Sequence, residues 1–170
     1  MQNKMLITLS AALFTAGLAT SAVAQAPAPA PAQPAAQQPM FATTKVEGTD
    51  NVYIFRYQNH QSMFIVTPAG VIVTDPISYG RPQAAKAYLD EIRKITQAPI
   101  KYLVYSHHHY DHIAGGKVFK DAGATVISHR RAKERLVQLK APDVVIPDQV
   151  VDGKRTIKLG GTTLDLIFTG

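Results

Sequence analysis

The segment KYLVYSHHHYDHIAGG, residues 101–116, passes from an apolar run directly into four histidines, an aspartate and a pair of glycines. The run IKYLVYS, residues 100–106, is apolar on both faces, which is typical of a strand buried between two layers. A histidine run alone is weak evidence for a metal, because a histidine is more often a polar or core residue than a ligand. Its position after a buried strand and before two glycines favours a metal site over a chance run.

The spacing of these side chains suits two metal ions. In an extended segment His107 and His109 point the same way, so both can approach one ion while His108 faces away. Asp111 and His112 follow as the chain turns toward a helix, which brings an oxygen and a nitrogen near a second ion. Imidazole nitrogen suits zinc, and the glycine pair lets the backbone fold tightly behind the ligands.

The residues before this segment predict three antiparallel strands and a helix. The strands are rich in β-branched and aromatic residues and lie at residues 52–57, 62–67 and 71–75, with the turn PAG before the third. A helical period follows within residues 77–95, with Pro82 in the first turn. The apolar positions of that helix are Ala85, Tyr88, Leu89, Ile92 and Ile95.

The residues after it predict further alternation of helices and strands. We expect a short helix ended by Gly123, a strand ATVIS at residues 124–128, and a basic helix at residues 130–140. A hairpin with the turn Gly160-Gly161 closes the chain at residues 155–170. The order strand, helix, strand, helix predicts an α/β fold whose sheet contains crossovers.

The amino terminus predicts export. Residues 1–24 are typical of a signal peptide, with Lys4, an apolar run at residues 5–19 and cleavage after Ala24. That run is too short for a stable membrane anchor, so we expect no anchor after cleavage and a periplasmic or secreted protein. Residues 25–39 contain only Gln, Ala and Pro and predict a disordered linker, which places the folded domain at residues 40–170.

The composition excludes thiolate catalysis and disulfide bonds, and it gives little support for nucleic-acid binding. The chain has no cysteine, so neither thiolate catalysis nor disulfides are available. Its formal net charge is +6, and basic residues cluster at residues 129–140. We interpret this cluster as the solvated face of a helix, because export argues against a nucleic-acid partner.

The motif HHHYDHIAGG, residues 107–116, resembles the His-x-His-x-Asp-His signature of the metallo-β-lactamase superfamily. Residues 51–76 look like the opening strands of that family, which end in a turn containing an aspartate, here Asp75. Residues 124–136 and 160–170 are similar to its next segments. The resemblance extends from about Val46 to Gly170.

The resemblance implies a fold and a mechanism. The fold is the first half of a four-layer αβ/βα metallo-β-lactamase sandwich. His107 and His109 would bind a first Zn²⁺, and Asp111 and His112 a second. Asp111 would also orient or deprotonate the attacking water, and a metal-bound hydroxide would attack a carbonyl or ester-type centre. Asp75 would be a nearby support residue or, equally, an ordinary turn-capping aspartate.

Part of the family pattern does not occur in this sequence. The family has a further histidine after the strand that here reads LDLIFTG, then a bridging aspartate and a last histidine. His60 and His129 fall elsewhere, and we interpret both as ordinary polar residues. We therefore expect an N-terminal fragment of a longer exported hydrolase, with an incomplete domain at residues 40–170.

Two other functions stay open. One is a truncated metal-binding half domain without catalysis, and a minor one is redox chemistry at a di-iron site. For the hydrolase, the resemblance implies a small-molecule substrate with an ester, amide or lactam-type bond, and no nucleic acid.

Overall fold

The computed structural model describes residues 39–170. The predicted signal peptide and all but the last residue of the predicted linker lie outside these described residues. Within the described part, no helix is both long and apolar enough to cross a membrane.

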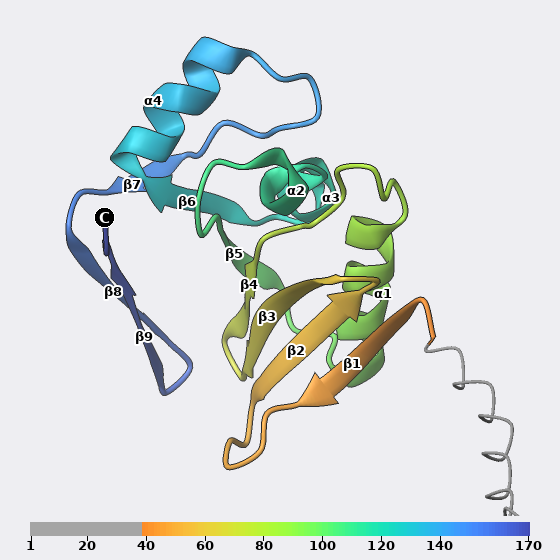
Figure 1. The fold of residues 1–170 in the computed structure, drawn as a ribbon. Helices are drawn as coiled ribbons and strands as arrows, with labels where there is room; N and C mark the ends of the chain where they lie inside the picture. Colours follow the sequence, from red (N-terminus) through yellow and green to blue (C-terminus); the bar gives the residue numbers. More distant parts are fainter. Residues whose placement is uncertain (1–38) are drawn as a thin grey trace, which may run out of the picture. The chain divides into compact units, whose positions relative to one another are not determined.

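A seven-stranded sheet organises the described residues (Figure 1). Its strands follow one another in sequence order, antiparallel from β1 to β4 and parallel from β4 to β7. The predicted opening strands and the later crossovers are both confirmed. The strands are β1 (Phe41–Lys45), β2 (Val52–Tyr57), β3 (His60–Thr67), β4 (Gly70–Thr74), β5 (Ile100–Val104), β6 (Thr125–His129) and β7 (Gln149–Val151).

Within residues 39–170, four helices connect and cover the strands, namely α1 (Ala84–Ile95), α2 (Tyr110–Ile113), α3 (Gly116–Asp121) and α4 (Arg130–Leu139). The predicted helix period of α1 is confirmed for Ala85, Tyr88 and Ile92, which are buried. Ile95 is 40% exposed, because it is the last residue of the helix, where the chain turns away. Pro82 precedes the helix instead of starting it, since Gln83 is the N-cap.

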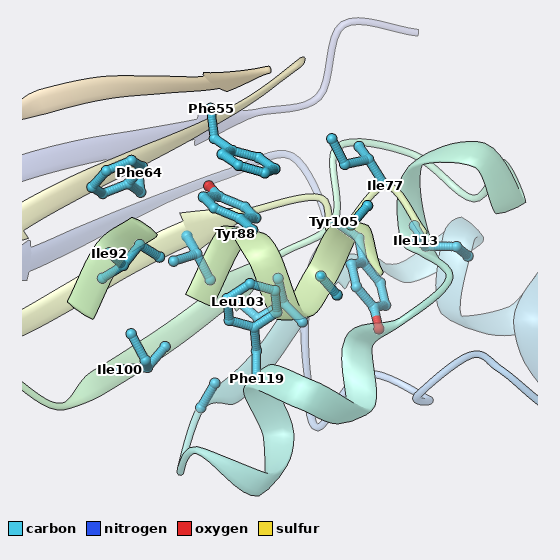
Figure 2. Packing of buried hydrophobic residues seen from close by; sticks show 14 of the residues in the cluster. Phe55, Phe64, Ile77, Tyr88, Ile92, Ile100, Leu103, Tyr105, Ile113 and Phe119 are labelled. Carbon is cyan, nitrogen blue, oxygen red and sulfur yellow. The ribbon is translucent and has the colours of Figure 1, made fainter. Parts of the chain in front are cut away.

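The larger core lies between the sheet and α1 and is built around Tyr88 (Figure 2). The Tyr88 ring stacks on Phe55, with centroids 4.5 Å apart, and meets the rings of Phe64 and Phe119 edge-on. Its hydroxyl donates to the carbonyl oxygen of Met63 at 2.7 Å, which satisfies a polar group in an apolar environment. Burial raises the pKa of Tyr88, so this hydroxyl stays neutral and serves as a donor.

The opposite face of the sheet packs against a hairpin, β8 (Lys154–Leu159) and β9 (Thr162–Ile167), whose strands pair as predicted around Gly160-Gly161. Within β5, Leu103 belongs to the core under α1, whereas Val104 contacts the cluster on the hairpin side. The prediction that this strand is buried on both faces is therefore confirmed. The buried residues on the hairpin side are Ile65, Ile72, Val104, Ile127, Val151 and Ile157.

Candidate metal centre

The candidate site lies where three strands reach the same edge of the sheet. β4 and β5 are parallel, so Asp75 and the histidine run follow strand ends that lie side by side. β3 runs antiparallel to β4, so His60 at the start of β3 lies at the same edge. The Ser62 hydroxyl donates to the backbone oxygen of Asp75 and ties the two strands together there.

The histidine run is not a strand. β5 ends at Val104, and residues 106–108 form bends before α2 begins. The predicted extended conformation is therefore wrong at residues 106–108, and His107 and His108 both line one cavity. His109 lies between them, with its ring 4.7 Å from that of His107 and 5.0 Å from that of His108.

Asp75 is the buried anchor of the site, with 5% of its surface exposed. Its Oδ1 accepts the backbone N–H of Ser106 at 2.8 Å, and its Oδ2 accepts the Ser106 hydroxyl at 2.5 Å. Oδ2 also lies 3.2 Å from Nδ1 of His112. A single carboxylate thus connects the end of β4, the loop after β5 and helix α2.

These bonds decide which nitrogen of each ring is free. The Ser106 hydroxyl has one proton, which it donates to Asp75, so it accepts from Nδ1 of His107 at 2.8 Å. Nδ1 of His112 likewise donates to Asp75. Both rings then carry their proton on Nδ1 and keep the lone pair of Nε2 available for a metal. Their centroids lie 4.3 Å apart.

The geometry brings three of the singled-out residues into one group. Asp75, His107 and His112 each offer a ligand atom, and these atoms lie within 4.8 Å of one another. Burial lowers the pKa of His107, and the neighbouring His112 lowers it further. A neutral imidazole is the form that binds a metal, so this shift favours ligation.

Asp111 lies beside this group on α2, and its side chain is 44% exposed. Its Oδ2 is 3.8 Å from Nε2 of His112 and 3.1 Å from Nε2 of His60. Partial burial raises the pKa of Asp111, but the His60 hydrogen bond and the nearby His112 outweigh it and lower the pKa below its usual value. The carboxylate is therefore ionised at neutral pH.

The backbone around α2 is held independently of these side chains. Arg81 donates from Nη2 to the carbonyl oxygen of Asp111 at 3.0 Å and from Nε to that of Ile77 at 2.9 Å. The N–H of Ile77 donates to the carbonyl oxygen of His112 at 2.8 Å. Ile77 and Asp75 both have positive φ, at 51° and 29°. This conformation is costly, and at Ile77 these bonds maintain it.

The glycine pair permits close packing behind the site, as predicted. Gly115 has φ of 87°, and a Cβ there would lie 2.6 Å from the side chain of Ser78. A Cβ on Gly116 would lie 2.2 Å from the hydroxyl of Tyr105. A larger residue at either position would push α2 away from the sheet.

Sequence reasoning left His60 out of the site, although the structure brings it to Asp111. The signal that could have found it is the register of β3 on β4, which pairs Phe64 with Val73 and so places the start of β3 beside the end of β4. His129, by contrast, contacts the carbonyl oxygen of Asp152 and the ring of Phe168.

A cavity of about 700 Å³ adjoins His107 and His108. Its walls come from the ends of β5 and β6, from α4 and from the end of β9. It combines apolar residues such as Val151 and Phe168 with the basic Arg131 and Arg135. Of the candidate ligands, His107 borders this cavity, whose volume lies in the range of small-molecule pockets.

Known proteins resemble this chain in sequence and in fold. Residues 57–168 match the profile of the Metallo-beta-lactamase superfamily. A hydroxyacylglutathione hydrolase of Pelagibacter ubique (strain HTCC1062) is 39% identical over 51 residues, which are 29% of this chain and 20% of that protein. A linear primary-alkylsulfatase of Pseudomonas sp. (strain ATCC 19151) is 33% identical over 89 residues, 52% of this chain and 15% of that protein. The matches thus span a fifth or less of these relatives.

Solved structures share the fold. A metallo-beta-lactamase from Pontibacter korlensis superimposes with a TM-score of 0.64 at 20% identity, over 75% of this chain and 60% of that one. A Cronobacter sakazakii metallo-beta-lactamase with the HARLDQ motif gives a TM-score of 0.58 at 26% identity, over 70% and 47%. With the family profile matched over most of the described residues, the chain belongs to the metallo-beta-lactamase superfamily.

Proposed function

We propose that this chain carries the metal-binding segment of an exported dinuclear zinc hydrolase. The observation that carries the proposal is the pair of hydrogen-bonded connections from buried Asp75 to His107 and His112, which leave both Nε2 atoms free. Such an arrangement, a carboxylate that orients the histidine through its other ring nitrogen, is typical of metal sites. The hydrolase names of the relatives support the same reaction class.

The residues present fit zinc. The donor set combines imidazole nitrogen and carboxylate oxygen, which zinc prefers when sulfur is absent. In this proposal His107 and His109 hold one ion, and Asp111 and His112 hold the other. Asp75 is a support residue, because its oxygens already accept bonds from Ser106 and His112.

Each residue has a distinct task in hydrolysis. Zinc held by these residues would polarise the scissile group and make a water molecule more acidic. The ionised Asp111 orients the attacking water and accepts its proton. The cavity beside His107 and His108 receives a small molecule with an ester, amide or lactam-type bond. Its apolar wall excludes water from the uncharged part of that molecule.

Metal titration combined with a hydrolysis panel tests this proposal. The purified chain is titrated with Zn²⁺ and offered β-lactam, lactone, thioester and sulfate-ester substrates. We expect about two ions per chain and turnover in at least one class, abolished in His109→Ala and retained in His108→Ala. Turnover that persists at the same rate in His109→Ala contradicts the ligand assignment.

A second candidate function is metal binding without catalysis. It is favoured by the exposure of Ile167 and Phe168 at the end of β9, because exposed apolar strand residues promote association between chains. The two candidates share the metal site and differ in turnover. Zinc bound at full stoichiometry with no hydrolysis of any substrate, together with self-association, favours this candidate.

Export is tested separately from chemistry. Residues 1–24 are fused to a reporter that is active only outside the cytoplasm, and the mature amino terminus is sequenced. We expect export and a mature chain that begins at Gln25, because cleavage follows the small residues before it. A reporter retained in the cytoplasm contradicts this prediction.

A further inference from the structure

We propose that His60 is a positioning residue that holds the carboxylate of Asp111 through its Nε2–H and thereby fixes the oxygen that Asp111 presents to the site. This inference rests on the proposed function, because it assigns a role relative to Asp111 as a ligand and water-orienting group.

The hydrogen bond joins two side chains that differ in how firmly they are held. Nε2 of His60 lies 3.1 Å from Oδ2 of Asp111. The His60 side chain is 25% exposed, whereas that of Asp111 is 44% exposed. Asp111 lies on the four-residue helix α2, and Arg81 donates to its backbone carbonyl oxygen and not to its carboxylate. The carboxylate therefore needs an anchor of its own, and His60 provides one.

The sheet makes His60 a rigid anchor. His60 is the first residue of β3 and pairs with Tyr57 at the end of β2. Two residues later, the Ser62 hydroxyl donates to the backbone oxygen of Asp75. The strand that carries His60 is thus tied to the residue that orients His107 and His112. Both anchors of the site depend on one pair of strands, because His60 begins β3 and Asp75 directly follows β4.

The geometry favours a supporting role over direct ligation. The His60 ring lies 5.8 Å from that of His112, compared with 4.3 Å between His107 and His112. A nitrogen that donates its proton to a carboxylate also has no lone pair to offer a metal.

The first test is metal-free and does not depend on catalysis. Nitrogen NMR of the whole labelled chain reports which ring nitrogen of His60 carries the proton. We expect Nε2–H in the wild type and a shift of this signal in Asp111→Ala. A proton on Nδ1 alone, or a signal that Asp111→Ala leaves unchanged, overturns the proposal.

The second test measures metal binding with the variants His60→Ala and His60→Gln. Affinity is determined by competition with a chromophoric chelator for Zn²⁺, and geometry from the visible spectrum of Co²⁺. We expect His60→Ala to keep both ions but bind one of them about tenfold more weakly. Because a glutamine amide can also donate, His60→Gln should recover part of the loss. Gln61→Ala, an exposed neighbour on the same strand, is the matched control.

A double substitution separates positioning from other roles. If His60 acts through Asp111, His60→Ala should have no further effect on metal affinity in an Asp111→Ala background. An equal loss in both backgrounds, or a fall from two ions to one in His60→Ala, overturns the proposal, and the latter makes His60 a ligand. If the wild type binds metal without hydrolysing any substrate, the proposed hydrolase fails, while the NMR and affinity results still decide the role of His60.

Discussion

The two halves of the site are anchored in different ways. His107 and His112 are connected to Asp75, which is buried at the end of a central strand and accepts three hydrogen bonds. Asp111 lies on a short helix, is substantially exposed and has a hydrogen bond to His60. We call these the Asp75 half and the Asp111 half.

This difference indicates which side chains the fold holds in place before a metal binds. In the Asp75 half, ring orientation is set by partly buried hydrogen bonds that lead to a carboxylate which is itself buried. In the Asp111 half, the carboxylate is near solvent, so its position depends on one hydrogen bond and on whatever it binds. The Asp75 half is therefore preorganised, and the Asp111 half is adjustable.

The largest loss of zinc affinity is expected from removing a histidine of the Asp75 half. His107→Ala should weaken zinc binding by more than about 100-fold, because it deletes a proposed ligand. Loss of a residue that only supports a ligand costs about 100-fold at most. Isothermal titration with Zn²⁺ measures this change.

The matched control is His108→Ala, which alters the adjacent ring in the same cavity. We expect it to change affinity by about twofold at most, as for an ordinary surface substitution. Equal losses in His107→Ala and His108→Ala contradict the assignment of the two rings.

Asp75→Ala should have a smaller effect on metal affinity than His107→Ala, but it should also lower stability. It should weaken metal binding about 10-fold to 100-fold, because both rings lose their orientation. It should also lower the free energy of unfolding by about 2 kcal/mol, since the N–H and hydroxyl of Ser106 lose their acceptor. Chemical denaturation measures the second effect.

Asp90→Ala is the control for that experiment. Asp90 is an exposed carboxylate on α1 that pairs with Lys86, so its loss should cost only about 0.4 kcal/mol. A similarly small cost in Asp75→Ala would show that the Asp75 half is not preorganised by burial.

The elements of the fold also differ in how well the sequence predicts them. The strands β2 and β4, helix α1 and the closing hairpin were predicted because strong local patterns specify them. β1 and β7 were not, since FATTK and QVV are short segments that become strands only by pairing with a neighbour. Local pattern is weak evidence at the edges of a sheet.

In the site, too, local sequence pattern does not predict contacts between distant residues. The motif at residues 107–112 predicted a metal site, and Asp75 was named because the family resemblance implies an aspartate in the turn after the opening strands. The contact between His60 and Asp111 depends on the register of β3 on β4, which joins residues 51 positions apart. The bend after Val104 was also missed, because an apolar run does not reveal where its last paired residue lies.

A third prediction concerns metal addition. At 100 times its dissociation constant, Zn²⁺ should raise the free energy of unfolding by about 2.7 kcal/mol, and a chelator should reverse the gain. Hydrogen exchange should slow more at residues 110–113 than at Thr74 and Asp75, because the Asp75 half is already ordered. Equal slowing in both segments contradicts the distinction between the halves.

The smallest expected effect is on the pH dependence of stability and concerns Asp148. This carboxylate accepts hydrogen bonds much as Asp75 does, but it lies at the surface. Asp148 accepts from Nζ of Lys120 at 2.6 Å and from the N–H of Val126 at 2.8 Å. Partial burial raises its pKa, but these two donors outweigh burial and lower it overall. Asp148 therefore contributes stability above its unfolded pKa of about 4, and this contribution is lost as the pH falls through the lower folded value.

Because solvent screens the ion pair between Asp148 and Lys120, Asp148 should contribute less than about 1 kcal/mol to the free energy of unfolding. Asp148→Asn should flatten the loss of stability below about pH 4 and leave zinc affinity unchanged. Unfolding curves between neutral pH and about pH 2 measure it, with the wild type as reference. If Asp148→Asn cost as much as Asp75→Ala, the number of hydrogen bonds, and not the burial of the acceptor, would be what makes an anchor in this fold.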